Sequence, residues 1–179
     1  MAKIASEWMS LGSSITASDG WATVKAHLKA VDEQLPNEGV YVIRTVRPFS
    51  IAYPKKPSPV LYIGEGNTKL RLRKHLKTWV VDLAKDFPSL KIEIRYTRPV
   101  TKKNKARHRD VEADLLWRFC KDYGALPLLN KQNEYHDRIH TYASGFMNIL
   151  NPGSGRGFKW ALMPISSNHN YIRKVDVED

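Results

Sequence analysis

Two short runs of β-branched and aromatic residues, 39–44 and 60–64, most constrain how this chain can fold. Such runs, bounded by turn-forming residues, are typical of β-strands. Four prolines fall between them, so we expect a long, stiff hairpin connection over 45–59 rather than a tight turn. Residues 90–97 alternate strictly between apolar and polar side chains, which predicts a third, half-buried strand.

Apolar residues recur at helical spacing in three other segments. Over 72–87 they fall three or four residues apart, which predicts an amphipathic helix. The same pattern predicts helices over 19–35, with Ser18 or Asp19 as the N-cap, and over 110–123. The order strand, strand, helix, strand, helix predicts an α+β fold in a single domain, not a parallel doubly wound sheet.

The charge of the chain is concentrated in one segment. The 179 residues carry a formal net charge of +11. Residues 66–109 hold 14 basic and 3 acidic side chains, which accounts for the whole excess. Lys and Arg that neutralise phosphates release condensed counterions, so the segment predicts a polyanionic partner. A polar loop is expected over 98–109.

Cysteine content and hydropathy bear on the compartment. The single Cys120 can form neither an internal disulfide nor a cysteine-based zinc site. The first residues lack the apolar core of a signal peptide, and no apolar stretch is long enough to span a bilayer. We therefore expect no membrane association and a cytoplasmic protein of prokaryotic or phage type.

The predicted helix over 110–123 contains one misplaced charge. Glu112 lies within its apolar stripe, beside Leu115 and Leu116, whereas Asp110 and Asp114 fall on the side expected to face solvent. An isolated buried carboxylate is very costly, so Glu112 must be paired, metal-bound or protonated.

Two further pairs of side chains have the chemistry to form a site together with this carboxylate. Strand alternation places Tyr41 and Tyr62 on one face of the hairpin. Arg71 and His75 are four residues apart and share a helix face beside the apolar stripe. With Glu112, this set suits metal-assisted phosphodiester cleavage, which needs a carboxylate for Mg²⁺, a base for water and cations for the transition state.

The order of these residues resembles that of a known family. The elements are Gly39-Val40-Tyr41, Tyr62-Ile63-Gly64, Arg71-x-x-x-His75, Glu112 and Asn130. Together they resemble the GIY-YIG nuclease superfamily over residues 38–130. The resemblance implies a small three-stranded antiparallel sheet flanked by helices. It leaves 1–37 and 131–179 as accessory segments for dimerisation or DNA recognition.

The resemblance also implies a reaction and a branch of the family. The chain is expected to hydrolyse double-stranded DNA with Mg²⁺, or another divalent cation such as Mn²⁺, held by Glu112. Arg71 would stabilise charge on the scissile phosphate, and Asn130 would buttress the site. The long insert between the tyrosines and the lack of an added DNA-binding module are most similar to type II restriction endonucleases. A homodimer on DNA is expected.

The resemblance also assigns roles to the two tyrosines and to His75. The resemblance makes Tyr41 the general base or the group that orients water, with Tyr62 contacting phosphate or water and His75 assisting the base or the leaving group. An unperturbed phenol titrates near 10 and is a poor base at neutral pH. Either nearby positive charge lowers the pKa of Tyr41, or the metal supplies the hydroxide, and the sequence leaves both routes open.

Other features of the sequence leave alternatives open. A DNA-binding module without catalysis and a structure-specific or non-specific nuclease remain possible functions.

His136-x-x-x-His140 has metal-ligand spacing, but no cysteine or carboxylate is in register, so the pair is interpreted as structural or solvated. A loop is expected over 153–157 and a strand over 158–165. The residues expected to contact the DNA backbone are Lys69, Lys74, Lys102, Lys103, Lys105 and Arg107.

The lysines of the polar loop give a prediction from sequence alone. Replacing Lys102, Lys103 and Lys105 with Ala should weaken binding about equally on all DNA sequences, because phosphate contacts carry no base information. A plot of log K against log salt should flatten by about one unit per lost contact. Fluorescence anisotropy at several salt concentrations measures both. An unchanged slope, or a loss of affinity for one sequence only, would assign these lysines another role.

Overall fold

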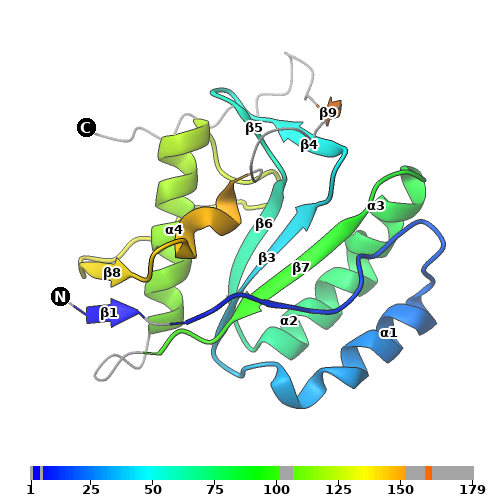
Figure 1. Cartoon of the computed structure of the whole chain (residues 1–179), viewed down its shortest axis with the longest axis horizontal. Coiled ribbons are helices and arrows are strands. Elements are labelled where there is room, and N and C mark those ends of the chain that lie inside the picture. Colours follow the sequence, from blue (N-terminus) through cyan, green and yellow to red (C-terminus); the bar gives the residue numbers. More distant parts are fainter. Residues whose placement is uncertain (1, 5, 101–106, 152–159, 163–179) are drawn as a thin grey trace.

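A four-stranded antiparallel sheet forms the centre of the molecule (Figure 1). The computed structural model describes residues 2–4, 6–100, 107–151 and 160–162. The strand order is β2 (Met9–Ser10), β7 (Ile92–Thr97), β3 (Gly39–Thr45) and β6 (Val60–Gly66). The α+β prediction is confirmed, and so are the three strands expected from the sequence. The short edge strand β2, from the N-terminal segment, adds a fourth.

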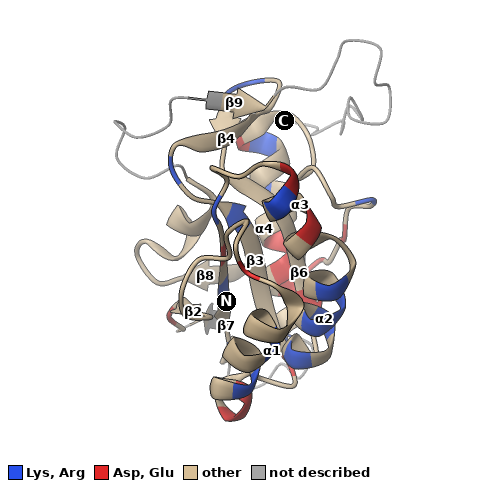
Figure 2. Ribbon diagram, turned by 90° about the vertical axis from the view of Figure 1, so that its right-hand side faces the viewer, with Lys and Arg blue, Asp and Glu red and all other residues tan. Residues whose placement is uncertain are grey.

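Helices cover both faces of this sheet. The helix α1 (Trp21–Ala30) and the pair α2 (Thr68–His75) and α3 (Val81–Asp86) lie over one face, and α4 (Arg107–Tyr123) lies over the other (Figures 1 and 2). The layers therefore run helix, sheet, helix, which buries both faces of the central strands.

The helix expected over 72–87 is continuous but irregular. It starts at Asn67, whose side chain accepts a hydrogen bond from the backbone N–H of Leu70 at 3.0 Å. Between α2 and α3 the turn widens into a π-helical segment, η2 (Leu76–Val80). Leu72, Leu76 and Val80 of its apolar stripe are fully buried, as the helical period predicted, whereas Phe87 at its end is exposed. Segments of π-helix occur frequently at functional sites.

Two predictions of local structure were wrong. The N-cap of α1 is Gly20, which has no side chain to cap the helix, and the Asp19 carboxylate instead accepts from Thr16 in the preceding turn. The stretch expected to be only a hairpin connection contains β4 (Phe49–Ala52) and β5 (Pro57–Ser58). These strands form a small second sheet with β9 (Trp160–Leu162), which lies parallel to β4. Long-range pairing here overrides the local proline signal.

The region before α4 also differs from expectation. The helix starts at Arg107, three residues earlier than predicted, so the last part of the expected loop is helical. Lys102, Lys103 and Lys105 lie outside the described residues, and so does the loop expected over 153–157. The strand β9 falls within the strand expected over 158–165.

The accessory segments complete the core of the single chain. Strand β1 (Ala2–Ile4) pairs in parallel with β8 (His140–Tyr142). The indole of Trp8 donates to the carbonyl of Phe146 at 2.9 Å, and the ring centroids lie 5.2 Å apart. Two short 3-10 helices, η1 (Asp32–Gln34) and η3 (Phe146–Leu150), join these segments to the rest. Trp8 and Phe146 are therefore used within the monomer.

Within the described part of the chain, no helix combines the length and the apolar character needed to cross a bilayer.

Candidate active site

The two tyrosines lie side by side on the sheet. In the antiparallel pair β3 and β6, Tyr41 stands opposite Gly64 and Tyr62 stands opposite Ile43. Both phenol rings therefore project from the same face, and their centroids are 6.0 Å apart. The common face inferred from strand alternation is what the structure contains.

Two glycines make room for this arrangement. A Cβ atom on Gly64 would lie 2.5 Å from the Tyr41 hydroxyl oxygen and 2.6 Å from a ring carbon of Tyr62. A Cβ on Gly39 would lie 2.4 Å from Oγ1 of Thr68, the first residue of α2. The glycine at position 64 leaves room for the rings of Tyr41 and Tyr62 against β6. The glycine at position 39 lets α2 approach the start of β3.

The helix α2 supplies a cation and an imidazole to the tyrosines. Arg71 Nε donates to the Tyr41 oxygen and Arg71 Nη2 donates to the Tyr62 oxygen, each at 3.2 Å. His75 Nε2 lies 3.0 Å from the Tyr41 oxygen. The helical spacing of Arg71 and His75 thus places both side chains on the tyrosine pair.

Trp79 fixes the proton of His75, a role that the sequence did not reveal. The indole Nε1 of Trp79 lies 3.0 Å from His75 Nδ1. Because an indole N–H can only donate, Nδ1 must accept and the ring proton of the neutral imidazole sits on Nε2. His75 therefore donates to Tyr41, whose oxygen receives hydrogen bonds from both His75 and Arg71. The only clue in the sequence is that Trp79 follows His75 by four residues.

Burial keeps these groups neutral in the metal-free protein. The pKa of the Tyr41 phenol is raised above its ordinary value, first by burial and then by the neighbouring Tyr62, while Arg71 opposes the shift. The pKa of His75 is lowered to about 4, by burial and then by the charges of Arg71 and Lys74. Protein groups alone therefore leave Tyr41 protonated near pH 7, as a poor base.

Glu112 is buried, as its place in the apolar stripe predicted. Only 8% of this residue is exposed. Its pKa is raised to about 8, first by burial and then by the charges of Glu65 and Glu134, against a lowering effect of Arg71. Near neutral pH the carboxyl is largely protonated unless a cation joins it.

Apart from Tyr41, which is fully buried, these side chains line one cavity of about 660 Å³ between α2 and α4. The cavity is lined by Tyr62, Glu65, Arg71, Lys74, His75, Trp79, Glu112, Leu116, Leu129, Asn130, Lys131, Gln132 and Glu134.

Two carboxylates of the cavity were not identified from the sequence. Glu65 continues the face of β6 that α4 covers, and it pairs with His108 Nε2 at 3.2 Å. Glu134 belongs to the segment after Asn130. With Glu112 they place three carboxylates on one cavity, and carboxylate oxygens are the ligands that Mg²⁺ prefers. The raised pKa of Glu112 also fits, because a cation would favour its ionised form.

Asn130 secures the edge of the sheet next to the cavity. Its side-chain oxygen accepts from the backbone N–H of Ile63 at 3.0 Å, and its amide donates to the carbonyl of Ile63 at 2.8 Å. Because β6 is an edge strand, these bonds pair backbone groups that no neighbouring strand reaches. This geometry matches the buttressing position expected for Asn130.

The residues expected to contact DNA divide into three groups. Lys74 lines the cavity, and Figure 2 shows basic residues gathered along α2. Lys69, also on α2, forms an ion pair with Asp32. Arg107 is held within the fold, because it donates to the carbonyl of Pro99 and lies 3.8 Å from a Glu38 oxygen. The three loop lysines fall outside the described residues.

The chain matches no protein-family model, and no curated protein or solved structure is significantly similar to it. The function is therefore inferred from the geometry of the site.

The contact from Trp79 gives a prediction about His75. Trp79→Phe keeps the ring but removes the N–H, so the imidazole should lose its fixed tautomer and protonate partly at Nδ1. Long-range ¹H–¹⁵N spectra of His75 near pH 7 report which nitrogen carries the proton. Trp117→Phe, at a half-exposed position on α4, is the control. Unchanged His75 nitrogen shifts in Trp79→Phe would contradict the assignment.

The buried carboxyl of Glu112 predicts a pH-dependent stability. The pKa of Glu112 is about 8 in the folded protein and 4.5 in the unfolded protein. The contribution of this carboxyl to the free energy of unfolding is therefore complete below about pH 4.5 and is lost as the pH rises through 8. With EDTA present, Glu112→Gln should therefore match the wild type near pH 5 and exceed it by several kcal/mol near pH 9. Urea unfolding across this range measures the difference.

The control for that series is Glu33→Gln, at an exposed position outside the cavity. The pH dependence of Glu112→Gln should exceed that of this control. If the two variants show the same pH dependence, burial does not raise the pKa of Glu112 as stated.

Proposed function

We propose that the chain is a Mg²⁺-dependent endonuclease that hydrolyses phosphodiester bonds of double-stranded DNA. The observation that carries this proposal is the pairing, in one cavity, of a buried carboxylate, Glu112, with a guanidinium, Arg71, fixed by two tyrosines. Phosphodiester hydrolysis needs both a place for a metal ion and a fixed positive charge on the phosphate.

Glu112 is the residue proposed to hold the cation, with Glu65 and Glu134 beside it. A bound divalent cation lowers the pKa of a coordinated water and neutralises charge on the phosphate. The carboxyl of Glu112 must lose its proton for this binding, so the raised pKa couples cation binding to proton release.

Arg71 is proposed to bind the scissile phosphate. Its hydrogen bonds to Tyr41 and Tyr62 fix the plane of the guanidinium, which costs less entropy than ordering a free side chain at the moment of binding. The guanidinium has five N–H donors, so others remain for phosphate oxygens.

Tyr41 is proposed to orient the attacking water rather than to deprotonate it. Burial raises the pKa of this phenol, and the two hydrogen bonds that its oxygen accepts leave its own proton to be donated. Of the two routes to a base, this favours hydroxide supplied by the metal. Tyr62 lines the cavity directly and is positioned to contact phosphate or water.

Charge supports nucleic acid as the substrate. The net charge of +11 is concentrated over 66–109, which includes α2 and the cavity residue Lys74. We further propose a cytoplasmic type II restriction enzyme acting as a homodimer, because one single-cation site cuts one strand per engagement and a two-fold dimer matches a palindrome. Trp8 and Phe146 pack within the monomer, so the dimer contacts would lie elsewhere.

Substitution of the two central residues tests the proposal. Glu112→Ala and Arg71→Ala should each reduce the rate of plasmid cleavage with Mg²⁺ or Mn²⁺ by at least about 10³-fold. DNA affinity should change only a few-fold, because most of it comes from other phosphate contacts. Glu112→Ala should remain folded, since it removes a buried carboxyl.

Glu33→Ala, an exposed carboxylate outside the cavity, is the matched control and should cleave normally. Wild-type rates in either cavity variant would refute the assignment. A wild-type chain that binds DNA without cutting it would support the non-catalytic module instead. Discrete fragments would indicate a restriction enzyme, and a smear would indicate a non-specific nuclease.

A further inference from the structure

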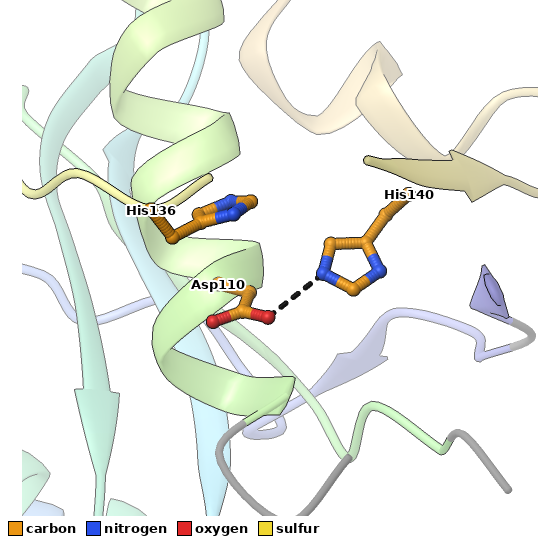
Figure 3. A group of neighbouring side chains, drawn as sticks. All are labelled: Asp110, His136 and His140. Atoms are coloured by element: carbon orange, nitrogen blue, oxygen red, sulfur yellow. Dashed lines mark hydrogen bonds and ion pairs between the residues drawn. The ribbon is translucent and has the colours of Figure 1, made fainter. Parts of the chain in front are cut away.

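A second group of ligating side chains lies on a different face of α4 (Figure 3). Asp110 and Glu112 are two residues apart on this helix, so they point to roughly opposite sides. Asp110 was expected to face solvent, and that expectation was wrong, because the segment leading into β8 covers it and leaves 2% of the residue exposed. That segment brings His136 and His140 to the carboxylate.

We propose that Asp110, His136 and His140 form a binding site for Zn²⁺, separate from the nuclease cavity. One ligand atom from each residue lies within 4.8 Å of the others. His140 Nε2 and Asp110 Oδ2 are already 2.8 Å apart (Figure 3). A tetrahedral zinc ion with bonds of about 2.0–2.2 Å holds its ligand atoms roughly 3.4 Å apart, so small side-chain rotations would close the site.

The chemistry of the donors selects the metal. Two imidazoles and one carboxylate suit Zn²⁺, whereas Mg²⁺ prefers oxygen ligands such as those of the Glu112 cavity. The sequence contained the spacing of His136 and His140 but no carboxylate in register with them. The fold supplies it from α4, far earlier in the chain.

Asp114, one turn after Asp110, holds the ring of His136. The carboxylate of Asp114 lies 3.0 Å from His136 Nε2 and accepts another hydrogen bond from the hydroxyl of Tyr142. The backbone N–H of Arg138 donates to His136 Nδ1 at 3.0 Å, so Nδ1 carries the lone pair and the ring proton sits on Nε2. A metal ion bound at Nδ1 would replace this backbone hydrogen bond. A carboxylate that fixes an imidazole in this way is typical of metal-binding histidines.

Arg138 occupies the place of the cation in the metal-free chain. Its Nη1 lies 3.0 Å and 3.2 Å from the two oxygens of Asp110, and 54% of its side chain is exposed. A divalent ion would take over the charge of Asp110 and release this arginine to solvent. When His140 Nε2 takes the metal, its proton can move to Nδ1, which is buried and has no hydrogen-bond partner among the described residues.

The proposed ion would fasten the wall of the nuclease cavity. His136 and His140 belong to the same stretch of chain as Asn130 and Glu134, which line that cavity. A metal bridge would hold this stretch of chain against α4. The site is inferred from its own ligands and does not depend on the nuclease assignment.

The test uses the full chain without a polyhistidine tag, stripped with EDTA and dialysed against Zn²⁺. One equivalent of zinc per chain, measured by mass spectrometry of the metal, is expected for the wild type. Co²⁺ in its place should give the visible absorption of a tetrahedral site. His136→Ala and His140→Ala should each lower the affinity at least about 10-fold. Glu112→Gln should keep the zinc, which separates this site from the nuclease cavity.

Arg138→Gln distinguishes a metal site from a simple ion-pair cluster. It removes the competing cation, so it should tighten zinc binding and raise the melting temperature with Zn²⁺, although it weakens the metal-free cluster. This measurement holds even if a histidine variant fails to fold. Zinc content no higher in the wild type than in His136→Ala and His140→Ala, or weaker zinc binding by Arg138→Gln, would overturn the proposal.

Discussion

The hydrogen bonds from Arg71 to Tyr41 and Tyr62 join the helix α2 to the central sheet at the centre of the candidate site. They need two strands in one register, a helix that starts close to the start of β3, and no side chain at Gly64. If any of these conditions fails, the guanidinium is no longer fixed. The fold and the site therefore depend on the same few contacts.

The electrostatic balance of the cavity follows from burial. Burial lowers the pKa of His75, raises that of Tyr41 and raises that of Glu112 to about 8, so these three groups beside Arg71 are mostly neutral near pH 7. A divalent cation would reverse this for Glu112, because it stabilises the carboxylate. Proton release and cation binding would then be one event, and the protonated carboxyl avoids the cost of an isolated buried charge.

The helix α4 connects the two proposed ion sites. One side contributes Glu112 to the cavity between α2 and α4, and another contributes Asp110 to the histidine cluster. Between them runs an apolar stripe with Leu115 and Phe119, both fully buried. A rigid, buried helix holds ligands on both sides more precisely than loops could.

The sequence by itself determined the three central strands β3, β6 and β7, the long helix and the residues of the tyrosine face. These follow from local periods: alternation places Tyr41 and Tyr62 together, and helical spacing places Arg71 with His75 and turns Glu112 inward. Each of these relations holds within one element or one hairpin, so the sequence pattern encodes it directly.

Only the tertiary structure decided what meets these residues from elsewhere in the chain. It brought Glu65 and Glu134 to Glu112, paired β4 with β9 across a proline-rich stretch, and buried Asp110 under a segment that contains two histidines. The physical reason is that such contacts depend on how layers pack over long sequence separations. Local hydrophobic period describes which face of an element is apolar, but not which distant segment covers its polar face.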